Sequence, residues 1–271
     1  MYDGPTMTRT LRLPILGVFA AIAITSTMDA TGLSTFSALP LFPLLGLCWY
    51  LQRLSRGELG FKCVQWRHYG LAALYPVSVV GAITIVAAAT GVIDLSHTNW
   101  RKAGINFILA TISTVLVVIV TEEGFFRGWL WVSLERAGLQ KASILLWSSI
   151  AFSLWHWSAV MLKTGFDPPR AQVPVFMVNA VVMGTVWALL RWISGSVIVS
   201  SVSHGLWNGM AYVFFGFGTK VGALGIKNTG LFGPEVGVLG LAANLIFAAA
   251  LWRWWKSGIS SRSLYTLEPM I

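Results

Sequence analysis

Residues 107–127 read FILATISTVLVVIVTEEGFFR, and this stretch decides the fold class. Its first part, from Phe107 to Val120, contains no charged residue. With its flanks it forms an apolar run over 104–134, which is longer than the about 20 residues that a membrane span needs. Two glutamates and an arginine follow inside the same run, although a charged side chain at the bilayer centre costs at least about 2.5 kcal/mol. The stretch therefore predicts a membrane helix whose charged side chains face the protein interior.

The rest of the chain has the same character. Of its 271 residues 56% are hydrophobic and only 11% are charged, whereas soluble domains carry about 25% charged residues. The apolar runs are continuous and do not alternate, which favours helices over a membrane barrel. These observations predict an all-α, polytopic transmembrane bundle of about eight spans, with residues 1–271 as a single membrane domain. The expected spans are 11–28, 34–52, 70–93, 104–134, 142–162, 172–193, 196–216 and 234–255.

The net charge of +9 has a distribution typical of membrane proteins. Lys and Arg gather in short connections between the apolar runs, for example Arg53 to Arg67 and Arg136 to Lys141. This is the bias of cytoplasmic loops, so the charge does not indicate a nucleic-acid partner. With eight spans the strongly basic connections fall on one side. An integral, multi-pass membrane protein with both termini in the cytoplasm is therefore expected.

The charged residues of the 104–134 span differ in their expected roles. Glu123 and Arg127 are four residues apart, so they meet on one helix face and can neutralise each other. Glu122 points about 100° away and lacks that partner. A buried site beside a second carboxylate disfavours its charged form, which suits a general base that works near neutral pH. The alternative is that these residues form a buried ion pair that only holds helices together.

Two later spans also contain polar residues. His156 lies in the fifth span, and His204 and Asn208 share one helix face in the seventh because they are four residues apart. A histidine in such a place is often a core residue with its hydrogen bonds satisfied, so each signal alone is weak. Counted from the basic connections, however, Glu122, His156 and His204 lie at comparable depths, about 10–20 Å into the membrane. We therefore expect one shared cavity, open to the cytoplasm.

Taken in order, these motifs support a resemblance. Glu-Glu-x-x-x-Arg at 122–127, Phe-x-x-x-His at 152–156 and His-x-x-x-Asn at 204–208 resemble the signature of the CAAX prenyl protease and bacteriocin-processing (CPBP) family. That family includes the Ras-converting prenyl-protein protease. The resemblance covers the catalytic helices, residues 104–216. It implies an intramembrane endopeptidase that hydrolyses a peptide bond of a membrane-associated substrate, either a CAAX-type or a leader-peptide-like one.

The resemblance also implies residue roles. Glu122 and His156 would activate water, His204 and Asn208 would stabilise the oxyanion, and Glu123 with Arg127 would support them. A second version has Glu122, His156 and His204 as ligands of Zn²⁺, although the chain lacks the HExxH motif of many zinc proteases. No other cofactor site is assigned, and the expected partners are membrane lipid and a peptide or protein substrate. The rival interpretations are a non-catalytic membrane immunity or scaffold protein, and a transporter.

Overall fold

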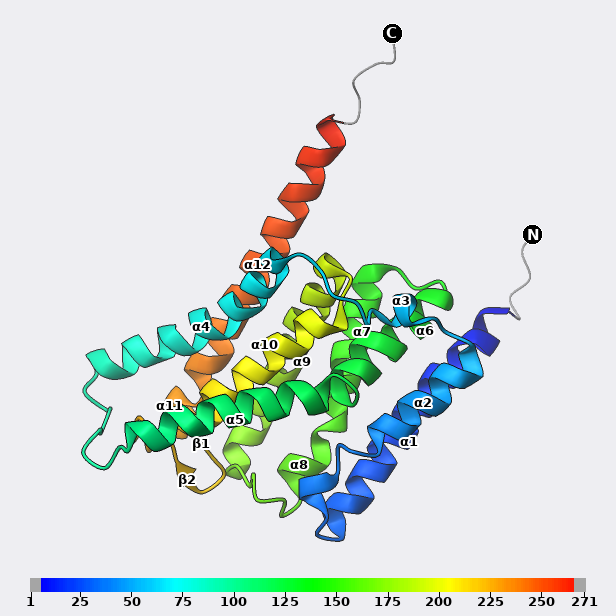
Figure 1. The fold of residues 1–271 in the computed structure, drawn as a ribbon. Helices are drawn as coiled ribbons and strands as arrows, with labels where there is room; N and C mark the ends of the chain where they lie inside the picture. The colour runs from blue at the N-terminus through cyan, green and yellow to red at the C-terminus, as the bar shows by residue number, and fades with distance from the viewer. Residues whose placement is uncertain (1–5, 266–271) are drawn as a thin grey trace.

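The computed structural model describes residues 6–265, with side chains from 11 to 257. Both chain ends lie outside these residues, and with them the predicted placement of the two termini. Figure 1 shows an assembly of helices with one small hairpin. In chain order the elements are α1 (Thr6–Ala30), η1 (Ser34–Phe36), α2 (Leu41–Gln52), α3 (Arg56–Leu59), α4 (Trp66–Ala89), α5 (Trp100–Val118), η2 (Gly124–Leu130), α6 (Trp131–Arg136), α7 (Lys141–Trp155), α8 (Trp157–Met161), η3 (Arg170–Gln172), α9 (Val173–Ser194), α10 (Val197–Met210), η4 (Ala211–Phe215), β1 (Gly216–Phe217), β2 (Lys220–Val221), α11 (Thr229–Phe232) and α12 (Val238–Tyr265).

The predicted polytopic helical bundle is confirmed, with one difference in the number of long spans. Within the described chain, seven helical segments are long and apolar enough to cross a membrane. The exception among the expected spans is 196–216, which forms α10 of 14 residues followed by the π-helical turn η4. At 1.5 Å per residue, α10 alone is about 21 Å long, shorter than the hydrocarbon core of a bilayer.

The expected span 104–134 is not one continuous helix, so this part of the prediction was wrong. Helix α5 ends at Val118, the chain turns at 119–121, and the helix resumes as the π-helical segment η2 and then α6. Thr121 donates its hydroxyl to the Val117 carbonyl, a bond that often bends a helix. At Gly124 an added Cβ would lie 2.6 Å from the Ile119 carbonyl oxygen, so glycine permits the close turn. The break places Glu122 and Glu123 at the start of a new helical segment.

Helix α10 occupies the middle of the bundle and contacts α4, α5 and α9 (Figure 1). Its approach to α5 is close because Gly205 and Gly209 face that helix. An added Cβ at Gly205 would lie 2.8 Å from the Thr111 carbonyl oxygen, and one at Gly209 would lie 2.1 Å from the Thr111 hydroxyl. Small residues spaced four apart are the usual device for close helix packing in membranes.

The glycine-rich segment 216–233 follows η4. In the structure it begins with the two-stranded antiparallel hairpin β1–β2 and ends with the single-turn helix α11. Backbone hydrogen bonds from Ala223 and Leu224 to the carbonyls of Val213 and Phe214 hold the segment against η4, which follows α10. The segment thereby covers one end of the bundle, beside the cavity described below.

Candidate active site

The predicted pair of Glu123 and Arg127 is present and completely buried. Arg127 Nη1 donates to Glu123 Oε1 at 3.2 Å, with no exposed side-chain surface on either residue. Arg127 Nη2 donates to the Gly184 carbonyl of α9 at 3.1 Å. The guanidinium also lies 4.2 Å from the ring centroid of Phe152 in α7. Arg127 therefore joins three segments of the bundle and neutralises Glu123 at the same time.

His204 is oriented by the same glutamate. Its Nδ1 lies 3.1 Å from Glu123 Oε1, so this one oxygen contacts both Arg127 and His204. An ionised carboxylate only accepts hydrogen bonds, so Nδ1 of His204 carries the proton and Nε2 faces away from Glu123. The indole of Trp187 stacks on the imidazole, with ring centroids 4.0 Å apart and an interplanar angle of 12°. The contact of Nδ1 with Glu123 and the stacking on Trp187 together fix the orientation of the imidazole ring.

His156 is held by the backbone. It lies at the end of α7, and its Nδ1 is 2.9 Å from the Phe152 carbonyl oxygen, which can only accept. The Phe152 ring packs edge-on against the imidazole with a centroid distance of 4.5 Å. Next to it, Trp155 donates its indole N–H to the Thr25 hydroxyl of α1 at 2.8 Å, which ties the end of α7 to the first helix. As in His204, Nε2 is the nitrogen left for the site.

Glu122 meets both histidines. Its Oε2 lies 3.9 Å from His156 Nε2 and 3.9 Å from His204 Nε2. This oxygen is buried, and within the described chain it has no hydrogen-bond partner. The structure therefore brings together three predicted residues from segments that are separated by at least 34 positions in the sequence. Their catalytic roles stay predictions.

A cavity of about 360 Å³ adjoins this cluster. His156, His204 and Asn208 contribute to its wall, whereas Glu122 is not part of the wall and lies next to the two histidines. Most of the remaining wall is aromatic or carries hydroxyl groups. It consists of Asp29, Ser34, Thr35, Ser37, Phe152, Ala159, Thr164, Phe166, Phe176, Ala180, Met183, Trp187, Tyr212, Phe217 and Glu235.

The position of this cavity differs from the expectation that it opens toward the basic, cytoplasmic connections. Its wall includes residues of three connections, 31–40, 162–172 and 216–237, which lie at the other end of the spans. In Figure 1 the α1–α2 turn, α8 and the β1–β2 hairpin lie on the lower side, and α3 lies on the upper side. The predicted depths were measured only from the basic ends of the spans. They took no account of the loops at the other end, which border the cavity.

The three candidate metal ligands do not fit one Zn²⁺ ion as they stand. Ligand atoms about 2.0–2.2 Å from a tetrahedral zinc are about 3.4 Å apart, shorter than the 3.9 Å from Glu122 to each histidine. Among the described His, Cys, Asp and Glu residues, no group of three is arranged to hold a metal ion.

Two carboxylates in the cavity wall were missed as site residues. Asp29 lies near the end of α1, and Glu235 precedes α12. Their side chains are 4% and 7% exposed. Glu122 was identified because it is a carboxylate within an apolar segment. Glu235 lies in the otherwise uncharged segment between Gly233 and Val238, so the same criterion indicates it as well.

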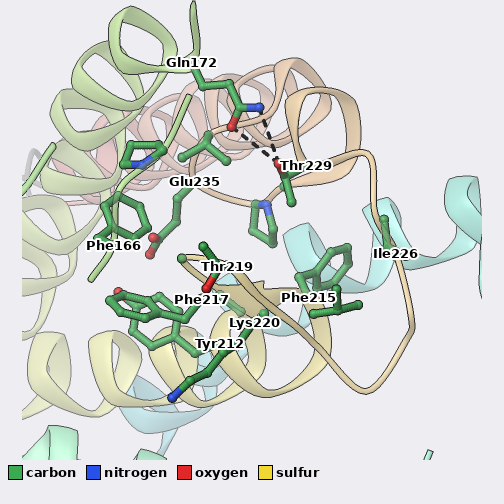
Figure 2. Close-up of a pocket in the computed structure, with 18 of the residues that line it drawn as sticks. Phe166, Gln172, Tyr212, Phe215, Phe217, Thr219, Lys220, Ile226, Thr229 and Glu235 are labelled. Atoms are coloured by element: carbon green, nitrogen blue, oxygen red, sulfur yellow. Dashed lines mark hydrogen bonds between the residues drawn. The ribbon is translucent and has the colours of Figure 1, made fainter. Parts of the chain in front are cut away.

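Glu235 also lines a second cavity of about 300 Å³, which shares Phe166, Tyr212 and Phe217 with the first. Figure 2 shows this second cavity, in which the Glu235 carboxylate points between Phe166 and Tyr212. The Lys220 side chain points away from that carboxylate. The four shared residues separate the two cavities. Glu235 therefore belongs to the boundary of the candidate site.

Comparison with known proteins agrees with the motifs. Residues 104–210 match the family model described as type II CAAX prenyl endopeptidase, Rce1-like, and this range contains all three motifs. No curated protein matches the chain. Asp29 and Glu235 lie outside the matched range. Residues 104–210 therefore resemble type II CAAX prenyl endopeptidases, which confirms the resemblance of the motifs. The chain is an integral membrane protein, and the match supports an endopeptidase activity of this type in general terms.

Proposed function

We propose that the chain cleaves a membrane-associated peptide by means of a water molecule that Glu122 activates between His156 and His204. One observation carries the proposal: Glu122 Oε2 lies 3.9 Å from Nε2 of both histidines. With Nδ1 of each histidine donating elsewhere, the neutral rings present acceptor nitrogens to an acceptor oxygen. A water molecule, which donates two hydrogen bonds, is the group that joins such acceptors.

The proposed reaction proceeds through a tetrahedral intermediate. Glu122 takes a proton from the water as its oxygen forms a bond to the scissile carbonyl carbon, with His156 orienting that water. The carbonyl oxygen gains the negative charge. When the carbon–nitrogen bond breaks, the leaving amine takes the proton from Glu122. Atoms and charges then balance, and Glu122 returns to its starting state.

The oxyanion would be stabilised by Asn208 and His204. Asn208 lines the cavity and offers an amide N–H₂ group. His204 Nε2 lies 3.9 Å from Glu122 Oε2, so the proton that Glu122 takes from the water can move to Nε2, be donated to the oxyanion, and return to Glu122 before the amine leaves. The Glu123 carboxylate orients the ring from Nδ1, as the Asp does in the Asp–His pair of serine proteases. Arg127 balances the charge of Glu123 while His204 is neutral.

The test is the Glu122→Gln variant, which keeps size and hydrogen bonding but removes the base. Purified wild type and variant would be assayed in liposomes against a library of membrane-anchored peptides, with and without a metal chelator. We expect cleavage by the wild type in both conditions and none by Glu122→Gln, with unchanged thermal unfolding. Glu135→Gln, at an exposed position, is the matched control and should cleave normally.

Three other results would contradict the proposal. Full biological function of Glu122→Gln in cells would favour the immunity or scaffold interpretation. Movement of a solute across the liposome membrane, with no cleavage, would favour a transporter. Inhibition by the chelator, together with about one zinc ion per chain that His156→Ala loses, would replace the metal-free reaction with a metal-dependent one.

A further inference from the structure

Asp29 is a buried carboxylate in the cavity wall. Its side chain is 4% exposed, and its Oδ2 has no hydrogen-bond partner in the described part of the chain. The bond from Trp155 to Thr25 fixes α1 against the end of α7. Asp29 follows one helical turn later, about 6 Å further along α1, and therefore reaches the same cavity as His156.

Glu235 is held in the cavity wall by a buried polar network. Asn179 Nδ2 of α9 donates to the carbonyls of Pro234 and Glu235, both at 2.9 Å. Asn244 Nδ2 of α12 donates to Asn179 Oδ1 at 2.9 Å, and Asn244 Oδ1 accepts from the Tyr75 hydroxyl at 2.6 Å. Both asparagines are completely buried. The backbone of Glu235 is therefore fixed by three helices.

The Glu235 carboxylate is fixed as well. Trp207 of α10 donates its indole N–H to Glu235 Oε1 at 3.0 Å, and Trp207 stacks on Tyr75 with a centroid distance of 5.2 Å. Trp207 lies between His204 and Asn208 on the same helix, directly before Asn208. The network thus ties Glu235 to the helix that carries two of the candidate catalytic residues.

Within the described chain, neither carboxylate pairs with a lysine or an arginine. Among the described residues, no salt bridge involves Asp29 or Glu235, and no Lys or Arg lines the cavity. Unpaired carboxylates buried in a membrane protein are costly and usually mark a functional site. Phe166, Phe176 and Tyr212 line the same cavity, and aromatic rings attract ammonium and guanidinium groups. An acidic and aromatic wall of this kind is suited to a cation.

From this wall we infer that the cavity binds a basic side chain, lysine or arginine, of the peptide that is cleaved. The inference rests on the proposed function, which it deepens by naming the substrate class. A CAAX substrate ends three residues after its cysteine and would bring its terminal carboxylate near the cavity. Asp29 and Glu235 would repel that carboxylate. The preferred substrate is therefore a basic segment cleaved away from its C-terminus.

Binding tests the inference independently of cleavage. The probes are myristoylated, fluorescein-labelled decapeptides of alanine and leucine with an amidated C-terminus. One position in each peptide holds lysine, norleucine or glutamate, and a series of peptides places this residue at each position in turn. Affinities for Glu122→Gln are measured by fluorescence polarisation in non-ionic detergent, which supplies no lipid ammonium group. At one or more positions lysine should bind about 10- to 100-fold more tightly than norleucine, the gain of one or two charge-assisted hydrogen bonds. Glutamate, or a free C-terminal carboxylate, should bind more weakly.

Asp29→Asn and Glu235→Gln, each combined with Glu122→Gln, should reduce the preference for lysine. Asp94→Asn and Glu135→Gln are matched controls at exposed positions outside this cavity and should keep it. Equal binding of lysine and norleucine at every position, no binding of any peptide, or a preference that survives both cavity variants would overturn the inference. Failure of the proposed function would look different: a lysine preference in binding without cleavage by the wild type.

Discussion

At the scale of single residues, one oxygen atom organises the candidate site. Glu123 Oε1 accepts from Arg127 and contacts His204 Nδ1, so the charge of Glu123 is shared between a structural partner and a candidate catalytic one. Glu122, its neighbour in sequence, faces the other nitrogen of the same imidazole. Two adjacent glutamates therefore act on opposite sides of one ring, and a substitution at either has a distinct expected effect.

Arg127→Ala should lower stability strongly, because it leaves Glu123 buried without its cation. The expected loss is about 3–5 kcal/mol of unfolding free energy, as for other broken buried ion pairs. Thermal unfolding in detergent measures it. Arg136→Ala is the control, since Arg136 pairs with Glu58 at the surface, where both side chains are about two-fifths exposed. An unchanged melting temperature for Arg127→Ala would show that the pair does not hold the fold.

Asn208→Ala should slow cleavage by about 10²–10³-fold if the amide donates to the oxyanion. The loss should appear in kcat more than in KM, because the interaction strengthens only as charge develops on the oxygen. Steady-state kinetics with one cleaved peptide provide the measurement, and Asn228→Ala, in the segment before α11, is a control outside the cavity. Equal kcat values for Asn208→Ala and the wild type would remove Asn208 from the mechanism.

At the scale of elements, the site depends on how closely α10 approaches α5. His204 and Asn208 lie on α10 beside Gly205 and Gly209, which contact α5 where a side chain would not fit. The turn at 119–121 and the π-helical segment η2 then direct Glu122 toward α10. π-helical turns are rare and frequent at functional sites. Helix spacing and helix irregularity together set the distances within the site.

Gly205→Val should separate α10 from α5 and displace His204, because the added Cβ would approach the α5 backbone to 2.8 Å. We expect a lower melting temperature and loss of cleavage. The control is Gly81→Val in α4, where an added Cβ meets nothing within 4 Å. Stability and activity are measured together on both variants. Wild-type values for Gly205→Val would mean that the close contact of the two helices is not required.

At the scale of the whole molecule, the cavity and the basic connections lie at opposite ends of the bundle. The cavity is bordered by 31–40, 162–172 and 216–237, and the basic residues gather near α3 and between α6 and α7. If the basic end is cytoplasmic, as the distribution of Lys and Arg predicts, the cavity opens toward the other side of the membrane. This orientation therefore determines from which side of the membrane the substrate enters the cavity.

Thiol labelling distinguishes the two orientations. Cys63 is exposed in the basic connection, and Cys48 is buried and serves as an internal negative. A membrane-impermeant maleimide should label Cys63 only after cells are permeabilised. In a Cys63→Ser background, Lys163→Cys, at an exposed position near the cavity end, should be labelled in intact cells. The reverse pattern would place the cavity on the cytoplasmic side and contradict the orientation predicted from charge.

The sequence by itself determined the membrane class and the helical fold, and it indicated the residues of the candidate site. Each of these depends on local properties: the length of an apolar run, the cost of a charge within it and the side-chain spacing along one helix. Glu123 and Arg127 meet because residues four apart share a helix face, whatever the rest of the fold does. The order of the three motifs was enough to indicate the family.

Only the tertiary structure decided which segments meet and where the cavity lies. The break after Val118, the shared contacts of Glu122 with two histidines, and the entry of Asp29 and Glu235 into the same cavity all depend on packing between helices. Packing of this kind depends on glycine contacts and buried hydrogen bonds between distant segments, such as Asn179 with Asn244. Periodicity and composition carry no record of such pairings, because they describe each helix separately.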